Sequence, residues 1–189
     1  MLKLYSNLVG QKVVSFQEET KIACFEDLVV KAENAQVLGA FVRQKSLLKS
    51  KRKLIVLTDV LEFSNAIYVQ GTEVLLEPNE LIRTPNLEDR YFPLIDLPVT
   101  DTDGNKLGKV IDYVFETLSG QIVKFHVQPN ALSFHKEHRI IPRSKIHSLS
   151  AKKLVISDAA QKAKAELESL LELDPAFSRK ASFSTKTKY

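Results

Sequence analysis

Apolar residues along this chain occur in short runs separated by polar segments, which is typical of β-strands. In the run 123–127, Val123, Phe125 and Val127 alternate with polar residues, which predicts a strand with these three side chains facing inward. Dense apolar stretches such as 54–57 are strand-sized, whereas a helix that crosses a bilayer needs about 20 largely apolar residues. Several short strands without an intervening helical period predict a small barrel or sandwich.

Turn sequences separate the expected strands of the second half. The dipeptide at 103–104 is Asp-Gly, and the segment 117–120 ends in a glycine where a hairpin favours positive φ. The residues that we expect to shape structural turns in this half are Asp103, Gly104, Gly108, Asp112 and Gly120.

The order of apolar and polar blocks is repeated in the two halves of the chain, which predicts an internal duplication. The closing segments correspond with one insertion, because Val60 and Val69 are nine positions apart and Ile146 and Ile156 are ten apart. The first two blocks of the first half together match the first block of the second half, and the other blocks match in order. The blocks are 8–14, 22–30, 35–43, 54–58 and 67–69 in the first half and 97–116, 121–127, 139–142 and 153–156 in the second.

These blocks predict two similar small domains, at 1–84 and 85–157, joined through a proline-rich acidic connector. Ser157 is a candidate cap for a helix over 158–175, whose apolar stripe either packs on the chain's own domain or binds a partner. The remaining residues, 176–189, are rich in Ser, Thr and Lys and predict a disordered basic tail.

The net charge of +4 arises in the tail, since removing the four basic residues of 178–189 leaves the rest formally neutral. Within that neutral part the charges are segregated. The stretch 43–53 carries six basic residues and no acid, whereas 73–103 is strongly acidic. Regions of opposite sign indicate a protein partner at least as readily as nucleic acid. A single cysteine, Cys24, excludes an internal disulfide and favours a reducing compartment.

The second half resembles the PRC-barrel family. The motifs are Gly-Asn-Lys-Leu-Gly-Lys-Val-Ile-Asp-Tyr-Val within 97–114, Ser-Gly-Gln-Ile at 119–122 and Ile-Ile-Pro at 140–142. The family is named for the cytoplasmic domain of the photosynthetic reaction-centre H subunit, and it includes the C-terminal domain of a ribosome maturation factor. The first half resembles a diverged copy, in which Ala23-Cys24 replaces Gly108-Lys109 and Asp27 matches Asp112.

The resemblance implies a mainly β protein with two small PRC-type β-barrels in tandem, followed by the C-terminal helix and the flexible tail. It also implies a protein without cofactor or catalytic residues. The residues themselves agree, because no phosphate-binding loop, nucleophile elbow or dinucleotide fingerprint occurs. The histidines at 126, 135, 138 and 147 lack the spacing of a closed zinc site. The acidic turn that begins at Asp101 starts like a calcium loop but has Lys106 where the sharp-turn glycine belongs.

The candidate partner-binding residues form two basic loops at corresponding places in the two halves. We expect a non-catalytic adaptor or assembly protein that docks on a protein complex, by resemblance a photosynthetic or membrane-associated one, and that is cytoplasmic or peripheral to a membrane. The alternative is a ribosome- or RNA-associated factor, and a third interpretation is that the lysines only keep strand edges soluble. The residues are Arg43, Lys45, Lys49, Lys51, Arg52 and Lys53 in the first loop and Lys136, Arg139, Arg143 and Lys145 in the second.

Overall fold

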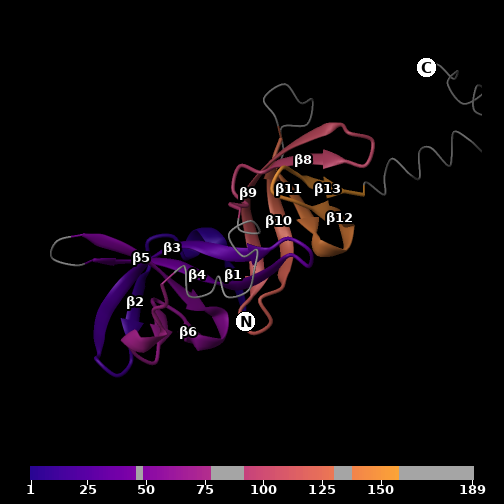
Figure 1. Ribbon diagram of the computed structural model, residues 1–189. Helices are drawn as coiled ribbons and strands as arrows, with labels where there is room; N and C mark the ends of the chain where they lie inside the picture. Colours follow the sequence, from indigo (N-terminus) through magenta and orange to yellow (C-terminus); the bar gives the residue numbers. More distant parts are fainter. Residues whose placement is uncertain (46–48, 78–91, 130–137, 158–189) are drawn as a thin grey trace, which may run out of the picture. The chain divides into compact units, whose positions relative to one another are not determined.

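The computed structural model describes residues 1–45, 49–77, 92–129 and 138–157 (Figure 1). These residues form two β-sheets connected by turns and short 3-10 segments, with no α-helix in the described ranges. Residues 1–156 form one compact unit. The helix predicted over 158–175 and the tail predicted over 176–189 lie outside the described residues.

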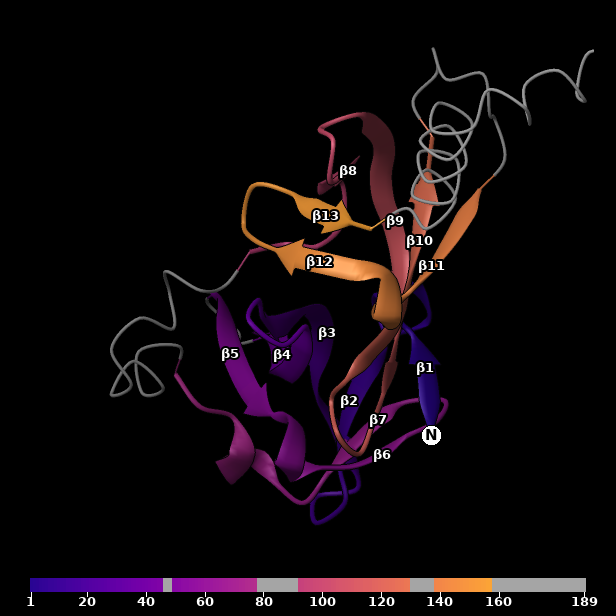
Figure 2. The ribbon, with the colours of Figure 1, turned by 90° about the vertical axis from the view of Figure 1, so that its right-hand side faces the viewer.

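The first sheet has six strands in the order β5-β4-β3-β2-β7-β6 (Figure 2). Its neighbours are antiparallel except for β2 and β7, which run parallel. A 3-10 turn, η2 (Leu57–Asp59), leads from β5 into β6. The strands are β2 (Lys12–Ser15), β3 (Thr20–Lys31), β4 (Gln36–Lys45), β5 (Ser50–Val56), β6 (Val60–Phe63) and β7 (Ile67–Val69).

The second sheet repeats this order six strands later, as β11-β10-β9-β8-β13-β12, again with one parallel pair, β8 and β13. A seventh strand, β1 (Leu2–Leu4), comes from the start of the chain and pairs with the end of β9. The turn η6 (Arg143–Lys145) corresponds to η2. The strands are β8 (Pro98–Asp101), β9 (Lys106–Glu116), β10 (Ile122–Gln128), β11 (Arg139–Pro142), β12 (Ile146–Leu149) and β13 (Leu154–Ile156).

The duplicated order of blocks therefore corresponds to a duplicated strand topology. The first and last residues of the closing hairpins pair as the spacing predicts: Val60 lies opposite Val69, and Ile146 lies opposite Ile156. We refer to the two sheets as repeat one and repeat two. The agreement extends to the backbone before the first strand of each repeat, where Gly10 (φ 76°) and Asp96 (φ 65°) both have positive φ.

The match between Asp27 and Asp112 is also structural. The Oδ1 atom of each aspartate accepts a hydrogen bond from the next backbone N–H, at 2.8 Å in both cases. Both residues lie at a β-bulge, where one strand carries an extra residue and the register shifts. The bulge places Glu26 outside the regular pairing of β3, which becomes important for the basic residues.

The alternation predicted for 123–127 is wrong at Val123. The pairing of β9 and β10 shifts between Ile122 and Lys124, so Val123 lies at an irregularity, and Ile122 takes the inward position instead. Ile122, Phe125 and Val127 are fully buried, while Val123 is half-buried. A bulge cannot be read from a period-two pattern, because the pattern assumes an uninterrupted register.

Of the five predicted turn residues, three lie in turns and two do not. Asp103 and Gly104 (φ 88°) lie in the turn between β8 and β9, and Gly120 (φ 71°) ends the hairpin between β9 and β10. Gly108 and Asp112 instead lie within β9. Gly108 has φ 146°, and a Cβ there would lie 2.0 Å from the carbonyl oxygen of Gln128, so glycine is required by a close strand approach rather than by a turn.

Aromatic side chains connect the two repeats through one shared core. The ring of Tyr5 stacks on Tyr113 at 4.8 Å between centroids and meets Phe25 edge-on at 6.2 Å. Phe63 of repeat one packs edge-on against Phe115 of repeat two at 5.9 Å. Because each repeat contributes side chains to a common interior, neither can lose its neighbour without exposing apolar surface.

Backbone hydrogen bonds join the repeats where β4 and β10 begin. Val37 N–H donates to the carbonyl oxygen of Gly120 at 2.8 Å, and Ile122 N–H donates to that of Ala35 at 3.0 Å. Ala35 (φ 48°) and Gly120 hold the same place at the end of their hairpins, so the two bonds are equivalent and reciprocal.

The centre of this junction is an antiparallel bridge between Gln36 and Gln121, which hold equivalent places in the two repeats. The Gln36 side chain adds a bond from its Nε2 to the carbonyl oxygen of Ser119 at 2.8 Å. A strand-like pairing of equivalent residues therefore links repeat one to repeat two. We call the residues 34–37 and 119–122 the junction.

Replacing Gly120 by alanine tests this junction. A Cβ at Gly120 would lie 2.2 Å from the carbonyl oxygen of Val37, whereas a Cβ at Gly104 would meet nothing within 4 Å, and both glycines have positive φ. The left-handed conformation alone costs about 1–2 kcal/mol, and we expect Gly120→Ala to lose roughly 2 kcal/mol more than Gly104→Ala through overpacking. Urea denaturation measures both, and equal losses would contradict the tight junction.

Candidate functional site

The first basic segment is not a loop, contrary to the prediction. Arg43 and Lys45 lie in β4, Lys51, Arg52 and Lys53 lie in β5, and Lys49 directly precedes β5. Arg43 lies opposite Arg52 in the antiparallel register. The segment contains no glycine or proline, and its described residues pair as two antiparallel strands. Its described basic side chains therefore lie on or directly beside the strands of a sheet.

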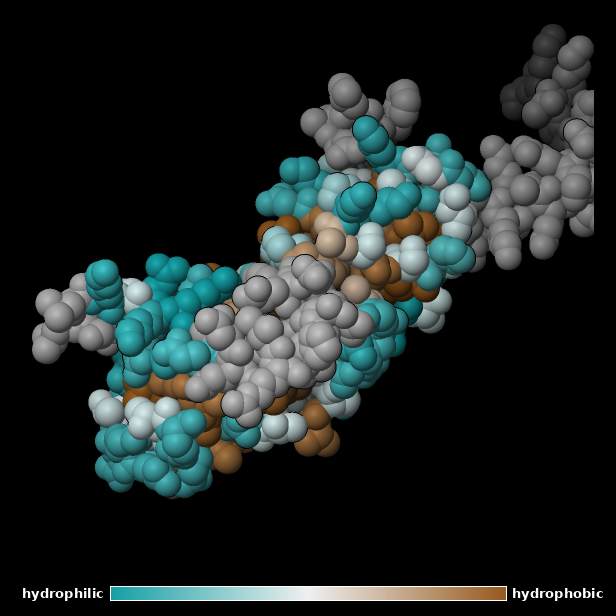
Figure 3. Space-filling view, viewed as in Figure 1, coloured by the Kyte–Doolittle hydropathy of each residue, from teal (hydrophilic) through white to brown (hydrophobic). Residues whose placement is uncertain are grey.

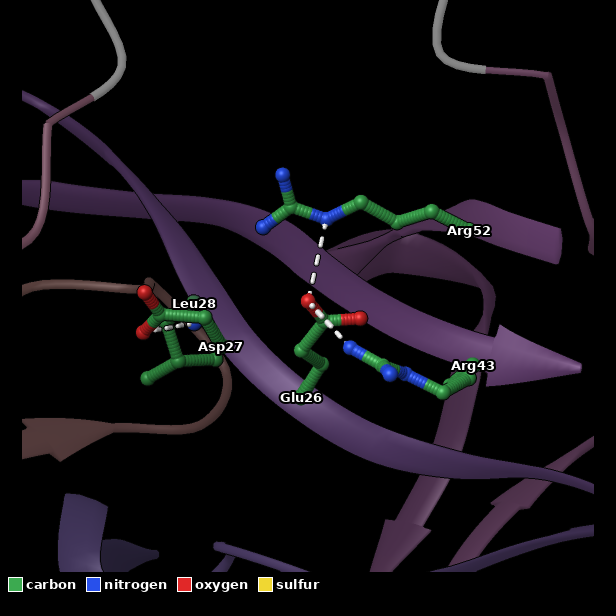
Figure 4. Close-up of polar contacts among 5 residues, drawn as sticks. All are labelled: Glu26, Asp27, Leu28, Arg43 and Arg52. Atoms are coloured by element: carbon green, nitrogen blue, oxygen red, sulfur yellow. Dashed lines mark hydrogen bonds and ion pairs between the residues drawn. The ribbon is translucent and has the colours of Figure 1, made fainter. Parts of the chain in front are cut away.

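An internal carboxylate holds the two arginines of this hairpin (Figure 4). Arg43 Nη2 lies 3.0 Å from Glu26 Oε1, and Arg52 Nε lies 3.5 Å from the same oxygen. The guanidinium of Arg52 also lies over the ring of Phe41, with its Cζ 3.8 Å from the centroid. Like charges placed opposite each other on neighbouring strands repel, and Glu26, displaced by the bulge, offsets that repulsion.

The lysine nearest the end of the basic segment is also paired. Lys53 Nζ donates to Glu77 Oε1 at 2.6 Å. This hydrogen bond, followed by the positive charge of Lys53, lowers the pKa of Glu77 below its ordinary value. Next to this pair, Leu54 and Leu76 form an isolated antiparallel bridge on the outer edge of β5, with both backbone bonds at 2.9 Å.

The second basic segment divides in a similar way. Arg139 lies in β11, Arg143 and Lys145 lie in η6, and Lys136 lies outside the described residues. Arg143 Nη1 donates to the carbonyl oxygen of Asn34 and, at 3.4 Å, to that of Ala35. Arg143 therefore binds to the junction, because it donates hydrogen bonds to carbonyl groups of the hairpin that precedes β4.

A hollow of about 250 Å³ lies where the residues 32–35 meet η6 and β12. Arg143 and Leu149 are among the residues that line it. Their counterparts in repeat one are Leu57, the first residue of η2, and Phe63, the last residue of β6. Phe63 packs against Phe115, whereas the smaller Leu149 lines the hollow.

The turn that begins at Asp101 is a hydrogen-bonded turn within the β8–β9 hairpin. Asp101 Oδ1 accepts bonds from the backbone N–H groups of Asp103 and Asn105, at 3.0 and 2.8 Å, and Oδ2 accepts from Asn105 Nδ2 at 2.8 Å. Both oxygens are thus used by the chain itself. In the described ranges no group of three or more His, Cys, Asp or Glu side chains is placed to hold a metal ion.

Three of the four histidines lie in the described ranges. His126 lies in β10 opposite Asp112, with its Nε2 buried. His138 and His147 are exposed, and His135 lies outside the described residues. His126 contacts no described cluster of further ligand residues, so the described part of the chain offers no metal centre of the kind that a histidine pair suggests.

Several large apolar side chains are exposed on strands and turns that are otherwise well packed (Figure 3). Phe16 directly follows β2, Leu61 lies in β6, and Ile140 lies in β11, and each exposes more than half of its side-chain surface. Leu118 occupies the tip of the β9–β10 hairpin. The basic residues had been the candidate site, and this apolar set was not among the predicted residues.

Residues 87–161 match the PRC-barrel domain family. The chain therefore contains a PRC-barrel domain, whose described strands run from β8 to β13. The sheet of residues 1–77 has the same strand order and is consistent with a diverged first copy. PRC-barrel domains are typically non-catalytic. A comparison with curated proteins finds no match to the chain.

In the ranges that the structure describes, no helix is long and apolar enough to cross a membrane.

Sequence reasoning missed contacts that depend on backbone pairing or that join one repeat to the other. The Leu54–Leu76 bridge, the Arg143 contact and the Phe63–Phe115 pair join segments distant in sequence. A residue-by-residue alignment of the two halves would have matched Arg143 with Leu57, and the change from leucine to arginine could have marked the contact that Arg143 makes.

Asp101 provides a pH-dependent test of the β8–β9 turn. Burial raises its pKa, but the hydrogen bonds from Asn105, Asp103 and Gly104 outweigh burial and lower the pKa below 3.8. A lowered pKa in the folded state contributes stability that is present above the unfolded value and lost as pH falls through the folded value. We expect Asp101→Asn to cost about 2 kcal/mol at neutral pH.

Urea denaturation between neutral pH and the acid range measures this effect. The difference between the wild type and Asp101→Asn should shrink as pH falls below 3.8. The matched control is Asp103→Asn, because the contact that Asp103 makes to Asp101 comes from its backbone. A difference that stays constant with pH would contradict the role assigned to the Asp101 carboxylate.

Proposed function

We propose that the protein is a non-catalytic adaptor or assembly factor, built as tandem PRC-type domains, that docks on a protein complex. The observation that carries the proposal is the set of exposed apolar side chains on or directly beside strands, among them Phe16, Leu61 and Ile140. Large apolar residues that are exposed on the free protein mark interaction surfaces, and they add affinity when a partner buries them.

The charge distribution supports protein docking over phosphate binding. Arg43 and Arg52 interact with Glu26, Lys53 interacts with Glu77, and Arg143 is bonded to carbonyl groups at the junction. A basic side chain that is already paired with a carboxylate or carbonyl group of the chain offers less free positive charge to a phosphate than an unpaired one does. An RNA-binding role would depend on the exposed lysines, among them Lys49 and Lys51.

The shared core supports a scaffold role. Two repeats fixed by a strand-like junction hold their exposed side chains at set positions, and a rigid surface loses less conformational entropy when it binds.

Affinity capture from the native host's lysate, with and without nuclease, tests the proposal. We expect a defined protein complex that survives nuclease, and we expect Phe16→Glu to reduce its recovery at least tenfold through loss of a buried contact. The charge control is Lys49→Glu combined with Lys51→Glu, which should leave recovery within twofold. Recovery of ribosomal or other RNA-bound proteins that disappear with nuclease and with the lysine variant would overturn the adaptor role.

A further inference from the structure

The two repeats have equivalent edge strands, and among the described residues only the edge in repeat one is covered. β5 and β11 each end their sheet, paired on one side to β4 and β10. Leu54 lies opposite Phe41, Ile140 lies opposite His126, and both Leu54 and Ile140 stand three residues before the 3-10 turn that follows. Leu54 and Ile140 are therefore the same position of the repeat.

In repeat one, the outer edge of β5 binds an extended piece of the same chain. Leu54 N–H donates to the carbonyl oxygen of Leu76 and Leu76 N–H donates to that of Leu54, both at 2.9 Å, and Leu54 is only 3% exposed. Glu77, the next residue, forms the ion pair with Lys53, the residue before Leu54. The edge thus takes an apolar residue followed by an acid, held by two backbone bonds and one ion pair.

In repeat two, the same position is open. Ile140 is 60% exposed, and β11 has no neighbour on its outer side within the described part of the chain. Arg139 stands where Lys53 stands in repeat one, and no carboxylate in the described ranges lies within 4.0 Å of it. The register gives Ile140 the orientation of Leu54, so its backbone N–H and carbonyl group point away from β10.

We propose that the outer edge of β11 binds an extended segment of a partner protein, in antiparallel pairing, through an apolar residue followed by an acidic one. The apolar residue would pair with Ile140 as Leu76 pairs with Leu54, and the acid would pair with Arg139 as Glu77 pairs with Lys53. This inference rests on the proposed adaptor function and specifies the partner's chemistry. Strand addition to an exposed edge is a common mode of peptide recognition.

The edge is short, which defines the interaction further. Pro142 lacks an N–H and ends β11. Ile140 is therefore the residue of β11 that directs both a backbone N–H and a carbonyl group to the outer side. Blocking an edge with proline also limits uncontrolled strand pairing, and a single bridge flanked by an ion pair gives selectivity for sequence rather than for any strand. The occupant is therefore a defined segment and not an extended sheet.

The probe for this edge is the chain's own segment 72–77 as a free peptide, Thr-Glu-Val-Leu-Leu-Glu, titrated into the ¹⁵N-labelled full-length protein. We expect the amide signals of Arg139, Ile140 and Ile141 to shift. Ile140→Asp should weaken binding at least tenfold, and it should leave the fold intact because the side chain is exposed. Val9→Asp, a change at another exposed apolar position that lies outside the proposed docking set, is the matched control and should bind as the wild type does.

A charge exchange distinguishes specific docking from non-specific hydrophobic binding. Arg139→Glu should weaken binding of the peptide several-fold, and a peptide with lysine in place of the final glutamate should restore it. Restoration requires the two charges to face each other in the bound state, which a purely structural role of Arg139 would not produce.

Four results would overturn the inference. Three are the absence of amide shifts at β11 at millimolar peptide, unchanged binding by Ile140→Asp, and self-association of the protein that Ile140→Asp abolishes, which would assign the edge to a second copy. The fourth is recovery of the same nuclease-resistant complex by the wild type and Ile140→Asp, which would remove β11 from the interface and leave the adaptor role standing. Failure of the wild type to recover any such complex would overturn the adaptor role itself.

Discussion

The pair of reciprocal backbone bonds at the junction is the constraint on which the rest of residues 1–156 depends. Each repeat donates one bond and accepts one, between Val37 and Gly120 and between Ile122 and Ala35. The bonds require two hairpins to end in residues of positive φ, which is why the chain has a glycine at one position and carries the cost of a non-glycine residue at the other. Around this pairing, Tyr5, Phe63 and their partners bury the surface that two small isolated sheets would expose.

The two repeats share one strand topology, and they differ at two positions on which the proposed function depends. Leu57 of repeat one packs at Gly120, whereas Arg143 at the same place in repeat two bonds to carbonyl groups. The outer edge of β5 is covered by residues 76–77, whereas no described residue pairs with the outer edge of β11, where Ile140 is exposed. A covered edge stabilises the chain, and the exposed edge is where we propose that a partner segment binds.

The sequence predicted the strand content, the duplication and the correspondence of Asp27 with Asp112, because alternation and block order depend on local chemistry. The prediction failed at Val123 because a bulge interrupts the period-two pattern. It failed at the expected basic loop because the segment contains no glycine or proline that would separate a turn from the two paired strands. The roles of Gly108, Arg143 and Leu76 depend on contacts between distant segments, such as the approach of Gln128 to Gly108, and these arise only once the sheet has formed.

Native-state hydrogen exchange at the amides of Val37 and Ile122 tests the junction most directly. If the reciprocal bonds join the two repeats into one cooperative body, both amides should exchange only through global unfolding, with the same opening free energy as the buried strand amide of Phe125. Exchange of Val37 and Ile122 orders of magnitude faster than that of Phe125 would show that the repeats separate while each stays folded, and would contradict the account.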